Sequence, residues 1–260
     1  FSGGRTYYSH PSLRDADKPK IPHQSSATGM QAIPATGAAM GLWYKASHNM
    51  ADWDDGNGPI VLCSLGDASV TEGEVAEAFQ MAALKRLPIL YLVQDNGWDI
   101  SANAAETRAQ DAAEYVRGFH GIEARSIDGS DFAACYAVLK EVIHTIRTER
   151  RPFLVHASVP LLNHHTSGVR KEWYRDDLER HQLRDPYPVL RHMLLEEGFG
   201  EADLESIERE AEQTVRADFE AARRAEDPRP EDLYTHDFAP TPVTEESGER
   251  EPAGREHKVM

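Results

Sequence analysis

Short hydrophobic runs recur along the first 160 residues, and polar turns separate them. A run of this kind, bounded by glycine, proline or aspartate, is typical of a buried strand in a parallel sheet. The first two runs are expected to be fully buried and to form one strand-helix-strand unit with a right-handed crossover. The expected strands are Ile60–Leu65, Ile89–Val93, Ile122–Ile127 and Pro152–Val159.

Helices are expected between these strands. The Ala-, Gly- and Met-rich segment Met30–Ala46 predicts a tightly packed, buried helix, with Pro34 in the first turn where proline is tolerated. Thr71 and Glu74 form a possible capping box for a second helix that runs to Arg86. A third helix is expected after a cap at Ser130, with one apolar face made by Phe132, Cys135, Leu139, Val142 and Ile146.

The alternation of strands and helices predicts an α/β fold with a mostly parallel sheet flanked by helices. Beyond Val159 a loop rich in His, Ser and Gly is followed by helices near Tyr187–Glu197 and Glu201–Arg224. The end of the chain is rich in Pro and Glu and predicts an extended tail. We therefore expect one binding domain over residues 1–200, lacking its N-terminal part, a helix at 201–225, and a linker or tail at 226–260.

Composition excludes some classes of function. A formal net charge of -16 argues against nucleic-acid binding, which requires clusters of Lys and Arg. Apolar stretches such as Pro88–Val93 are far shorter than the roughly 20 residues of a membrane span. Cys63 and Cys135 have no metal-binding or redox spacing, which favours a reducing, cytoplasmic compartment. Because the chain opens on Phe1 with no leader, we interpret it as a fragment or a processed piece.

Two polar turns carry the candidate chemistry. Asp67 follows the first expected strand and Asn96 follows the second, so both should lie at the same edge of the sheet. Carboxylate and amide oxygens suit Mg²⁺, which commonly combines them with phosphate oxygens. The turn Ala68–Gly73 leads into a helix, whose N-terminus could hold a diphosphate. An aspartate after a strand is also a common cap or turn residue, and this alternative stays open.

The stretch Gly66–Gly97 as a whole is a more specific signal than either turn alone. It resembles the thiamine-diphosphate signature, which runs from a Gly-Asp-Gly triplet to an Asn-Asn pair. Ala68 and Asp95 depart from that pattern, but neither position is expected to supply a side-chain metal ligand. The matching positions are Gly73, Glu77, Ala78, Ala82, Leu87-Pro88 and Asn96-Gly97. The resemblance implies that Mg²⁺ is held by Asp67, Asn96 and the main-chain oxygen of Trp98, and that the cofactor contacts Ser26, Gly66, Ala68, Ser69, Gln94, Ser101 and His165.

Flanking residues narrow the resemblance. Over nearly residues 1–200 the chain resembles the alpha part of the 2-oxo acid dehydrogenase decarboxylating component. The paired histidines, followed by Thr166-Ser167, resemble the branched-chain (2-oxoisovalerate) enzymes more than the pyruvate ones. The resemblance implies that His165 contacts the diphosphate and assists acyl transfer, while His164 supports the loop. An isolated His-His pair would otherwise be read as a solvated loop. The residues that carry this resemblance are Ser25-Ser26, Leu84–Val93, Ile100-Ser101, Asn163–Gly168 and Trp173-Tyr174-Arg175.

The implied activity is oxidative decarboxylation of a small 2-oxo acid, with thiamine diphosphate as electron sink and acyl transfer to a lipoyl group. The implied partners are a beta part that supplies the glutamate activating the cofactor, within a heterotetramer, and a lipoyl-bearing acyltransferase. The tail Glu249–Met260 resembles the connection to a fused beta part, or is a simple disordered terminus.

Three alternatives remain at this point: a pyruvate or acetoin dehydrogenase component, a transketolase-like protein, and a degenerate homologue that keeps the fold without the cofactor.

Overall fold

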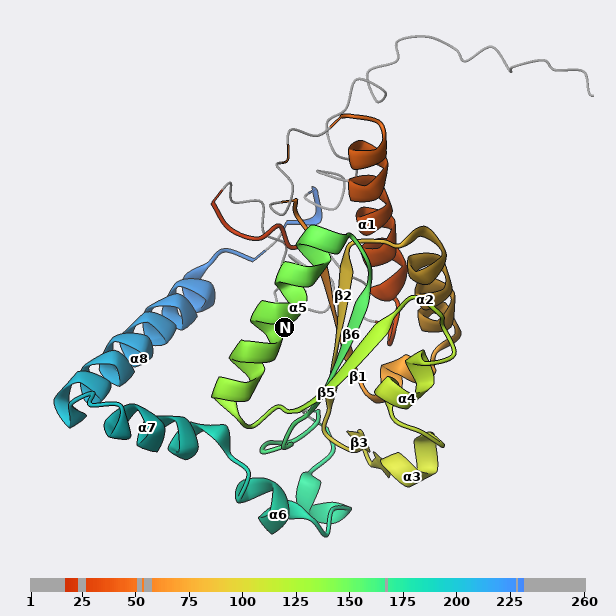
Figure 1. Cartoon of the computed structure of the whole chain (residues 1–260). Helices are drawn as coiled ribbons and strands as arrows, with labels where there is room; N and C mark the ends of the chain where they lie inside the picture. The colour runs from red at the N-terminus through yellow and green to blue at the C-terminus, as the bar shows by residue number, and fades with distance from the viewer. Residues whose placement is uncertain are drawn as a thin grey trace, which may run out of the picture.

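A four-stranded parallel sheet forms the centre of the protein, which is described here from a computed structural model (Figure 1). The structure describes residues 17–22, 27–50, 53, 58–166, 168–227 and 229–231. The strands lie in the order β1-β2-β6-β5, and every pair is parallel. Their bounds are β1 Val61–Gly66, β2 Ile89–Asp95, β5 Glu123–Asp128 and β6 Phe153–Ser158.

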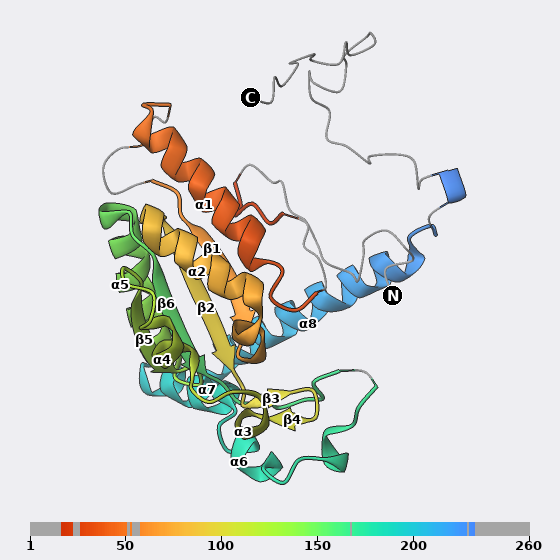
Figure 2. The same ribbon diagram turned by 90° about the vertical axis from the view of Figure 1, so that its right-hand side faces the viewer.

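Helices cover both faces of this sheet (Figure 2). On one face Val75 and Phe79 pack against Tyr91 of β2, and on the other Val142 and Ile146 pack with Leu90. The two cores are separated by the sheet because successive side chains of β2 point to opposite faces. The helices of the first face are α1 (Ala32–Ser47), α2 (Gly73–Lys85) and α4 (Ala112–Val116), and α5 (Phe132–Glu149) covers the second. The predicted α/β fold is confirmed.

Two expectations about burial are wrong. β1 was expected to be fully buried, but it is an edge strand whose Leu62 is 52% exposed. Cys63 and Leu65 are buried because they face the layer of α1 and α2. α1 was expected to be a buried helix, whereas it buries one face, with Ala32 and Ala39, and leaves Ile33 and Tyr44 exposed. In both cases a second covering layer is absent from the described residues.

The expected helix caps differ as well. A short 3-10 helix, η2 (Ala68–Thr71), comes before α2, and the Thr71 hydroxyl donates to the carbonyl of Ala68 at 2.8 Å rather than closing a capping box. Asp131, not Ser130, caps α5, and it accepts the N–H of Ala134 at 2.9 Å. Phe132 is exposed rather than part of the buried face of α5. At both caps the expected side chain makes another hydrogen bond, Thr71 to the carbonyl of Ala68 and Ser130 to the carboxylate of Asp128.

Smaller elements gather at the carboxyl end of the sheet (Figure 1). A hairpin of two short strands, β3 (Trp98–Asp99) and β4 (Ala102–Asn103), leads into α3 (Ala104–Thr107). The segment after β6, residues 159–166 and 168–185, begins at this end and folds back onto the hairpin, where Asp177 contacts Trp98; it is called the returning segment below. It contains η3 (Lys171–Trp173) and α6 (Leu178–Gln182).

The two helices predicted near the C-terminus are confirmed as α7 (Pro186–Glu196) and α8 (Glu201–Arg224). They extend away from the sheet (Figure 1), and α8 is exposed along nearly its whole length. Of the tail expected at 226–260, residues after 231 lie outside the described part of the chain. Within the described part, no helix combines the length and apolar character needed to cross a membrane.

Candidate functional site

Asp67 lies directly after β1 and is buried, with 4% of its surface exposed. Its backbone is helical at φ −62° and ψ −43°, and its side chain makes no capping hydrogen bond to η2. The carboxylate pairs instead with a guanidinium nitrogen of Arg108. The alternative in which Asp67 is a simple helix cap therefore does not describe this side chain.

Asp95 and Asn96 lie at the end of β2, next to Asp67. The parallel register pairs Gly66 with Gln94, so the turns that follow the two strands are neighbours, as the sequence predicted. Asp95 accepts the N–H of Gly97 at 2.9 Å, and the side-chain oxygen of Asn96 accepts the N–H of Trp98 at 2.9 Å. These two bonds shape the turn that leads from β2 into the hairpin.

Arg108 joins the ends of the two strands. One guanidinium nitrogen pairs with Asp67, and the other pairs with Asp95 at 2.8 Å. The residue ends α3, a helix that begins with a capping box between Asn103 and Glu106. Asp67 is buried, with 4% of its side chain exposed, and Arg108 and Asp95 are partly buried, with 10% and 13% exposed.

His156 of β6 completes the cluster from the other side, because its Nε2 lies 2.9 Å from the carboxylate of Asp95. Burial would raise the pKa of Asp95, but the hydrogen bond with His156, the charge of Arg108 and the N–H of Gly97 lower this pKa to about 2. The hydrogen bond to Asp95 in turn raises the pKa of His156 against the effect of burial. Burial and the charge of Asp95 raise the pKa of Asp67, although Arg108 opposes that shift.

Asp177 of the returning segment holds the hairpin to the rest of the site. Its carboxylate accepts the indole N–H of Trp98 at 2.9 Å and the Nε–H of Arg175 at 2.7 Å, and lies 2.9 Å from Nε2 of His181. Nδ1 of His181 accepts the N–H of Leu161 at 2.8 Å, so Nε2 carries the proton that faces Asp177. Burial lowers the pKa of His181, which agrees with a neutral ring.

The histidine loop lies in the same segment. His164 and His165 are partly buried, so the pair is not a freely solvated loop. Nδ1 of His164 accepts the N–H of Lys171 at 3.2 Å and thereby ties the two ends of the loop together. This geometry is the one expected of a residue that supports the loop.

Three buried polar atoms of the returning segment have no hydrogen-bond partner among the described residues. They are Nδ1 of His165, the hydroxyl of Tyr174 and Nη2 of Arg175. Tyr174 packs edge-on against the ring of Trp98, and the guanidinium of Arg175 lies 5.5 Å from the centre of the same ring. Because buried polar groups are nearly always paired, these atoms indicate a group that the described chain does not supply.

The other expected cofactor contacts lie around the two strand ends. The hydroxyl of Ser69 is buried and donates to the carbonyl of Gly66 at 2.6 Å. Gln94 accepts the Ser64 hydroxyl at 3.3 Å. Ala68 begins η2, Ser101 is exposed in the hairpin turn, and Ser26 lies outside the described residues. The structure thus brings most of these residues to one end of the sheet, while their contacts with a cofactor stay a prediction.

Sequence reasoning gave no role in the site to Asp95, which it treated only as a departure from a motif, or to Arg108, His156 and Asp177. His156 carried a signal, since it is a histidine within the apolar run that became β6. Arg108 and Asp177 had no such signal in the sequence, because the fold brings each of them next to a partner that is distant along the chain. Arg108 is 41 residues from Asp67 in sequence.

Comparison with known proteins decides the family. A family model described as "Dehydrogenase E1 component" matches residues 6–231. The chain belongs to the dehydrogenase E1 component family. The match extends beyond the residues 1–200 over which the resemblance was expected, and it confirms the resemblance to the alpha part of the 2-oxo acid dehydrogenase decarboxylating component.

Curated relatives of this E1 family chain include two kinds of alpha subunit. The pyruvate dehydrogenase E1 component subunit alpha of Rickettsia bellii is 29% identical over 210 residues, which are 80% of this chain and 61% of that protein. The mitochondrial 2-oxoisovalerate dehydrogenase subunit alpha of Homo sapiens is 29% identical over 223 residues, which are 84% of this chain and 48% of that protein. The chain spans about half to three-fifths of these relatives, and the equal identities leave the branched-chain preference a prediction.

Partial likenesses to solved structures were also found. The transketolase from Campylobacter jejuni has a TM-score of 0.43 and 21% identity over 50% of this chain and 20% of that chain. The transketolase from Leishmania mexicana has a TM-score of 0.46 and 15% identity over 54% of this chain and 21% of that chain. Likenesses this partial support no conclusion about function.

The residues of the site fit the implied Mg²⁺ and diphosphate in their chemistry. Asp67 and Asn96 offer hard oxygen ligands on neighbouring strand ends, and the unpaired buried atoms of His165 and Arg175 are suited to an anionic group. Within the described residues no group of three or more His, Cys, Asp or Glu side chains could hold a metal by itself. A metal at Asp67 would therefore depend on amide and main-chain oxygens and on the diphosphate.

Proposed function

We propose that this chain is the alpha part of a thiamine-diphosphate-dependent 2-oxo acid dehydrogenase, and that it holds the diphosphate and Mg²⁺. The family match over residues 6–231 supports the assignment to an E1 component. The names of the relatives support a 2-oxo acid as substrate, with pyruvate and 2-oxoisovalerate as the two candidates. The observation that carries the site is the register of β1 and β2, since it makes the turns of Asp67 and Asn96 neighbours.

In this proposal Asp67, Asn96 and the main-chain oxygen of Trp98 hold the metal. Asp177 positions Trp98, because it binds the indole while Arg175 packs on the same ring. A shift of Trp98 would move its main-chain oxygen as well. The returning segment would thus set the geometry of the metal site from a distance.

When bound, thiamine diphosphate supplies the electron sink for loss of CO2 from the 2-oxo acid. His165 is proposed to hold the diphosphate or to move a proton during acyl transfer to the lipoyl group. Its buried, unpaired Nδ1 is available for either role. The branched-chain substrate, the beta part, the heterotetramer and the lipoyl-bearing acyltransferase are parts of the same proposal.

The test is CO2 release and lipoamide acylation by the full-length protein with its beta part. Three substrates separate the candidates: 3-methyl-2-oxobutanoate and pyruvate, which can release CO2, and acetoin, which has no carboxyl group and is followed by acylation of lipoamide alone. Release of CO2 from 3-methyl-2-oxobutanoate with acylation of lipoamide is the expected result. A preference for pyruvate would correct the substrate, and activity on acetoin alone would refute the proposed reaction.

A non-catalytic homologue is the second candidate, and one observation favours it. The carboxylate of Asp67 is already paired with Arg108, an arrangement that can hold the two strand ends together without a metal. Calorimetric titration with thiamine diphosphate and Mg²⁺, in the presence of the beta part, distinguishes the two candidates. Absence of binding there would favour the non-catalytic homologue.

A further inference from the structure

A guanidinium occupies the position next to Asp67 where the proposed function requires a divalent cation to bind. Arg108 reaches Asp67 with one nitrogen and Asp95 with the other, and 10% of its side chain is exposed. A buried carboxylate close to a partly buried one is destabilised by repulsion unless a cation neutralises the pair or one of them takes up a proton. Arg108 contacts both carboxylates and supplies such a charge, while His156 contacts Asp95 as well.

The Arg108 guanidinium affects a bare cation and a cation bound to diphosphate differently. A bare divalent ion at Asp67 would have the guanidinium as a neighbour of like charge, and repulsion at such short range is strong in a partly buried site. A cation that carries a diphosphate brings several negative charges, which offset the charge of Arg108 and offer it a new partner. Arg108 therefore lowers the affinity of the site for the bare ion more than its affinity for the metal-diphosphate complex.

Arg108 also has a second anchor, which makes the exchange feasible. Its Nη2 binds Asp95 at 2.8 Å, and Asp95 is held in turn by His156 at 2.9 Å and by the N–H of Gly97 at 2.9 Å. If the guanidinium left Asp67, it would still be paired with a fixed carboxylate. The cost of leaving an unpaired buried charge would be avoided.

We propose that Arg108 weakens the binding of a bare divalent cation at Asp67, and that it thereby favours a divalent cation that arrives with a diphosphate. This inference rests on the proposed function, because it takes Asp67 as a metal ligand. It makes Arg108 a specificity residue for the metal-diphosphate complex. Because binding is reciprocal, it also predicts that diphosphate affinity depends strongly on the metal.

The experiment uses the full-length protein with its beta part and Mn²⁺ as the probe, measured by the electron paramagnetic resonance of free Mn²⁺. Mn²⁺ is titrated alone and with saturating thiamine diphosphate, without 2-oxo acid. In the wild type the diphosphate should tighten Mn²⁺ binding by at least about tenfold. In Arg108→Gln, binding of Mn²⁺ alone should tighten by at least about tenfold, so the effect of the diphosphate should shrink.

Controls distinguish this effect from a general change of charge or fold. Arg117→Gln removes an exposed positive charge that follows α4 and should behave as the wild type. Adding Asp67→Asn to Arg108→Gln should abolish the gain, because the gain requires the freed carboxylate. Circular dichroism checks folding, and Arg108→Met, which keeps most of the side-chain volume, serves if Arg108→Gln does not fold.

Two results would overturn the inference. One is a wild type that binds Mn²⁺ equally well with and without thiamine diphosphate, which requires no variant. The other is a folded Arg108→Gln protein whose Mn²⁺ affinity is unchanged. The Mn²⁺ titration contains no 2-oxo acid, so it does not depend on catalysis. Failure of a separate decarboxylation assay would refute the proposed function but not the measured effect of Arg108 on Mn²⁺ binding. Unchanged Mn²⁺ affinity of Arg108→Gln in an enzyme that decarboxylates would refute the role of Arg108 alone.

Discussion

Replacing Asp177 with Asn tests whether the returning segment holds the site together. The carboxylate of Asp177 binds Trp98, Arg175 and His181, and 11% of its side chain is exposed. The side chain of Arg175 is fully buried. Asn keeps the shape of Asp177 but removes the negative charge, so the buried guanidinium would lose its counter-ion.

The lowered pKa of Asp177 and the general cost of breaking a buried ion pair bracket the size of the loss. Burial alone would raise the pKa of Asp177, but the bonds from Arg175 and Trp98 and the charge of Arg175 outweigh it and lower this pKa to about 2. The ordinary pKa of an aspartate is 3.8, and the difference from about 2 corresponds to about 2 to 3 kcal/mol. Breaking a buried ion pair costs about 3 to 5 kcal/mol. We expect Asp177→Asn to lower the free energy of unfolding by about 3 kcal/mol at pH 7.

The direction of the pH dependence follows from the lowered pKa. A carboxylate whose pKa is lower in the folded state stabilises the fold above its unfolded pKa of about 4 and loses this effect as the pH falls toward 2. About half of the contribution should be gone at pH 3. The difference between wild type and Asp177→Asn should therefore be smaller at pH 3 than at pH 7.

The assay is urea denaturation of the full-length protein, followed by tryptophan fluorescence at both pH values. Asp176→Asn is the matched control, since Asp176 is the exposed neighbour in sequence and should cost little. A loss below about 1 kcal/mol at pH 7, or a difference that is the same at both pH values, would refute the role given to Asp177.

Three further predictions follow from the site. Asp67→Ala or Asn96→Ala should abolish metal-dependent binding of thiamine diphosphate in calorimetry, whereas Ala at the exposed Asp99 should not. His165→Ala should lower the rate of lipoamide acylation more than cofactor retention, and acylation at the wild-type rate would contradict its role. Ile100 has a φ of +52°, a backbone conformation that is costly for a β-branched residue. Ile100→Asn should therefore raise the free energy of unfolding by up to about 1 kcal/mol in urea denaturation. A clear decrease in that free energy would refute the proposed backbone strain.

Much of the fold could be predicted because its signals are local. Apolar runs between turn residues predicted all four strands of the main sheet, and β2 and α8 were placed within two residues of their ends. Local patterns gave wrong predictions where a side chain made a different hydrogen bond nearby. Thr71 lies in a 3-10 turn, and its hydroxyl donates to the carbonyl of Ala68 instead of accepting the N–H that a capping box requires.

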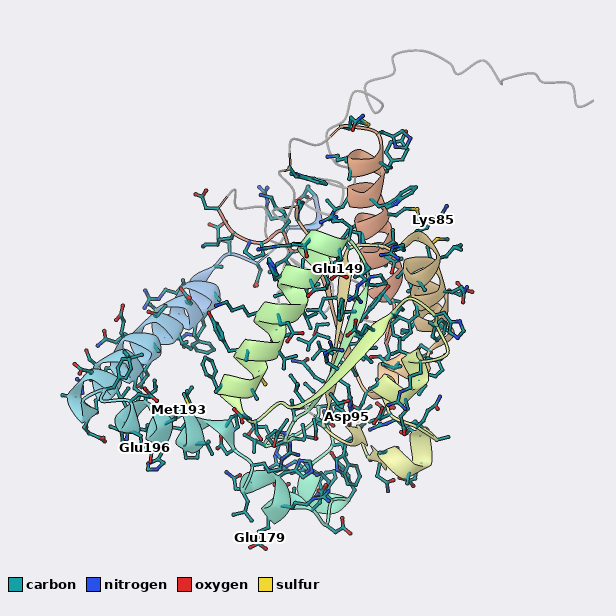
Figure 3. All side chains as sticks on the ribbon, in the orientation of Figure 1. Lys85, Asp95, Glu149, Glu179, Met193 and Glu196 are labelled. Carbon is teal, nitrogen blue, oxygen red and sulfur yellow. The ribbon has the colours of Figure 1, made fainter. Side chains whose placement is uncertain are left out.

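Prediction from the sequence was incomplete at the carboxyl end of the sheet, which Figure 3 shows. Asp95 lies there, at the end opposite to Lys85 and Glu149. Its neighbour Asn96 was predicted at this edge because strand ends of parallel strands meet there. Asp95 itself was treated as a departure from a motif, although the structure makes it the residue that both Arg108 and His156 contact.

The sequence by itself determined the α/β class, the family resemblance and the placement of Asp67 and Asn96 after neighbouring strands, because these depend on short-range pattern. Only the tertiary structure decided which distant residues complete the site. The insertion of β6 between β2 and β5 brings His156 to Asp95 across 61 positions, and the returning segment brings Asp177 to Trp98 across 79. Such contacts depend on strand order and loop path, for which a stretch of sequence carries no local signal.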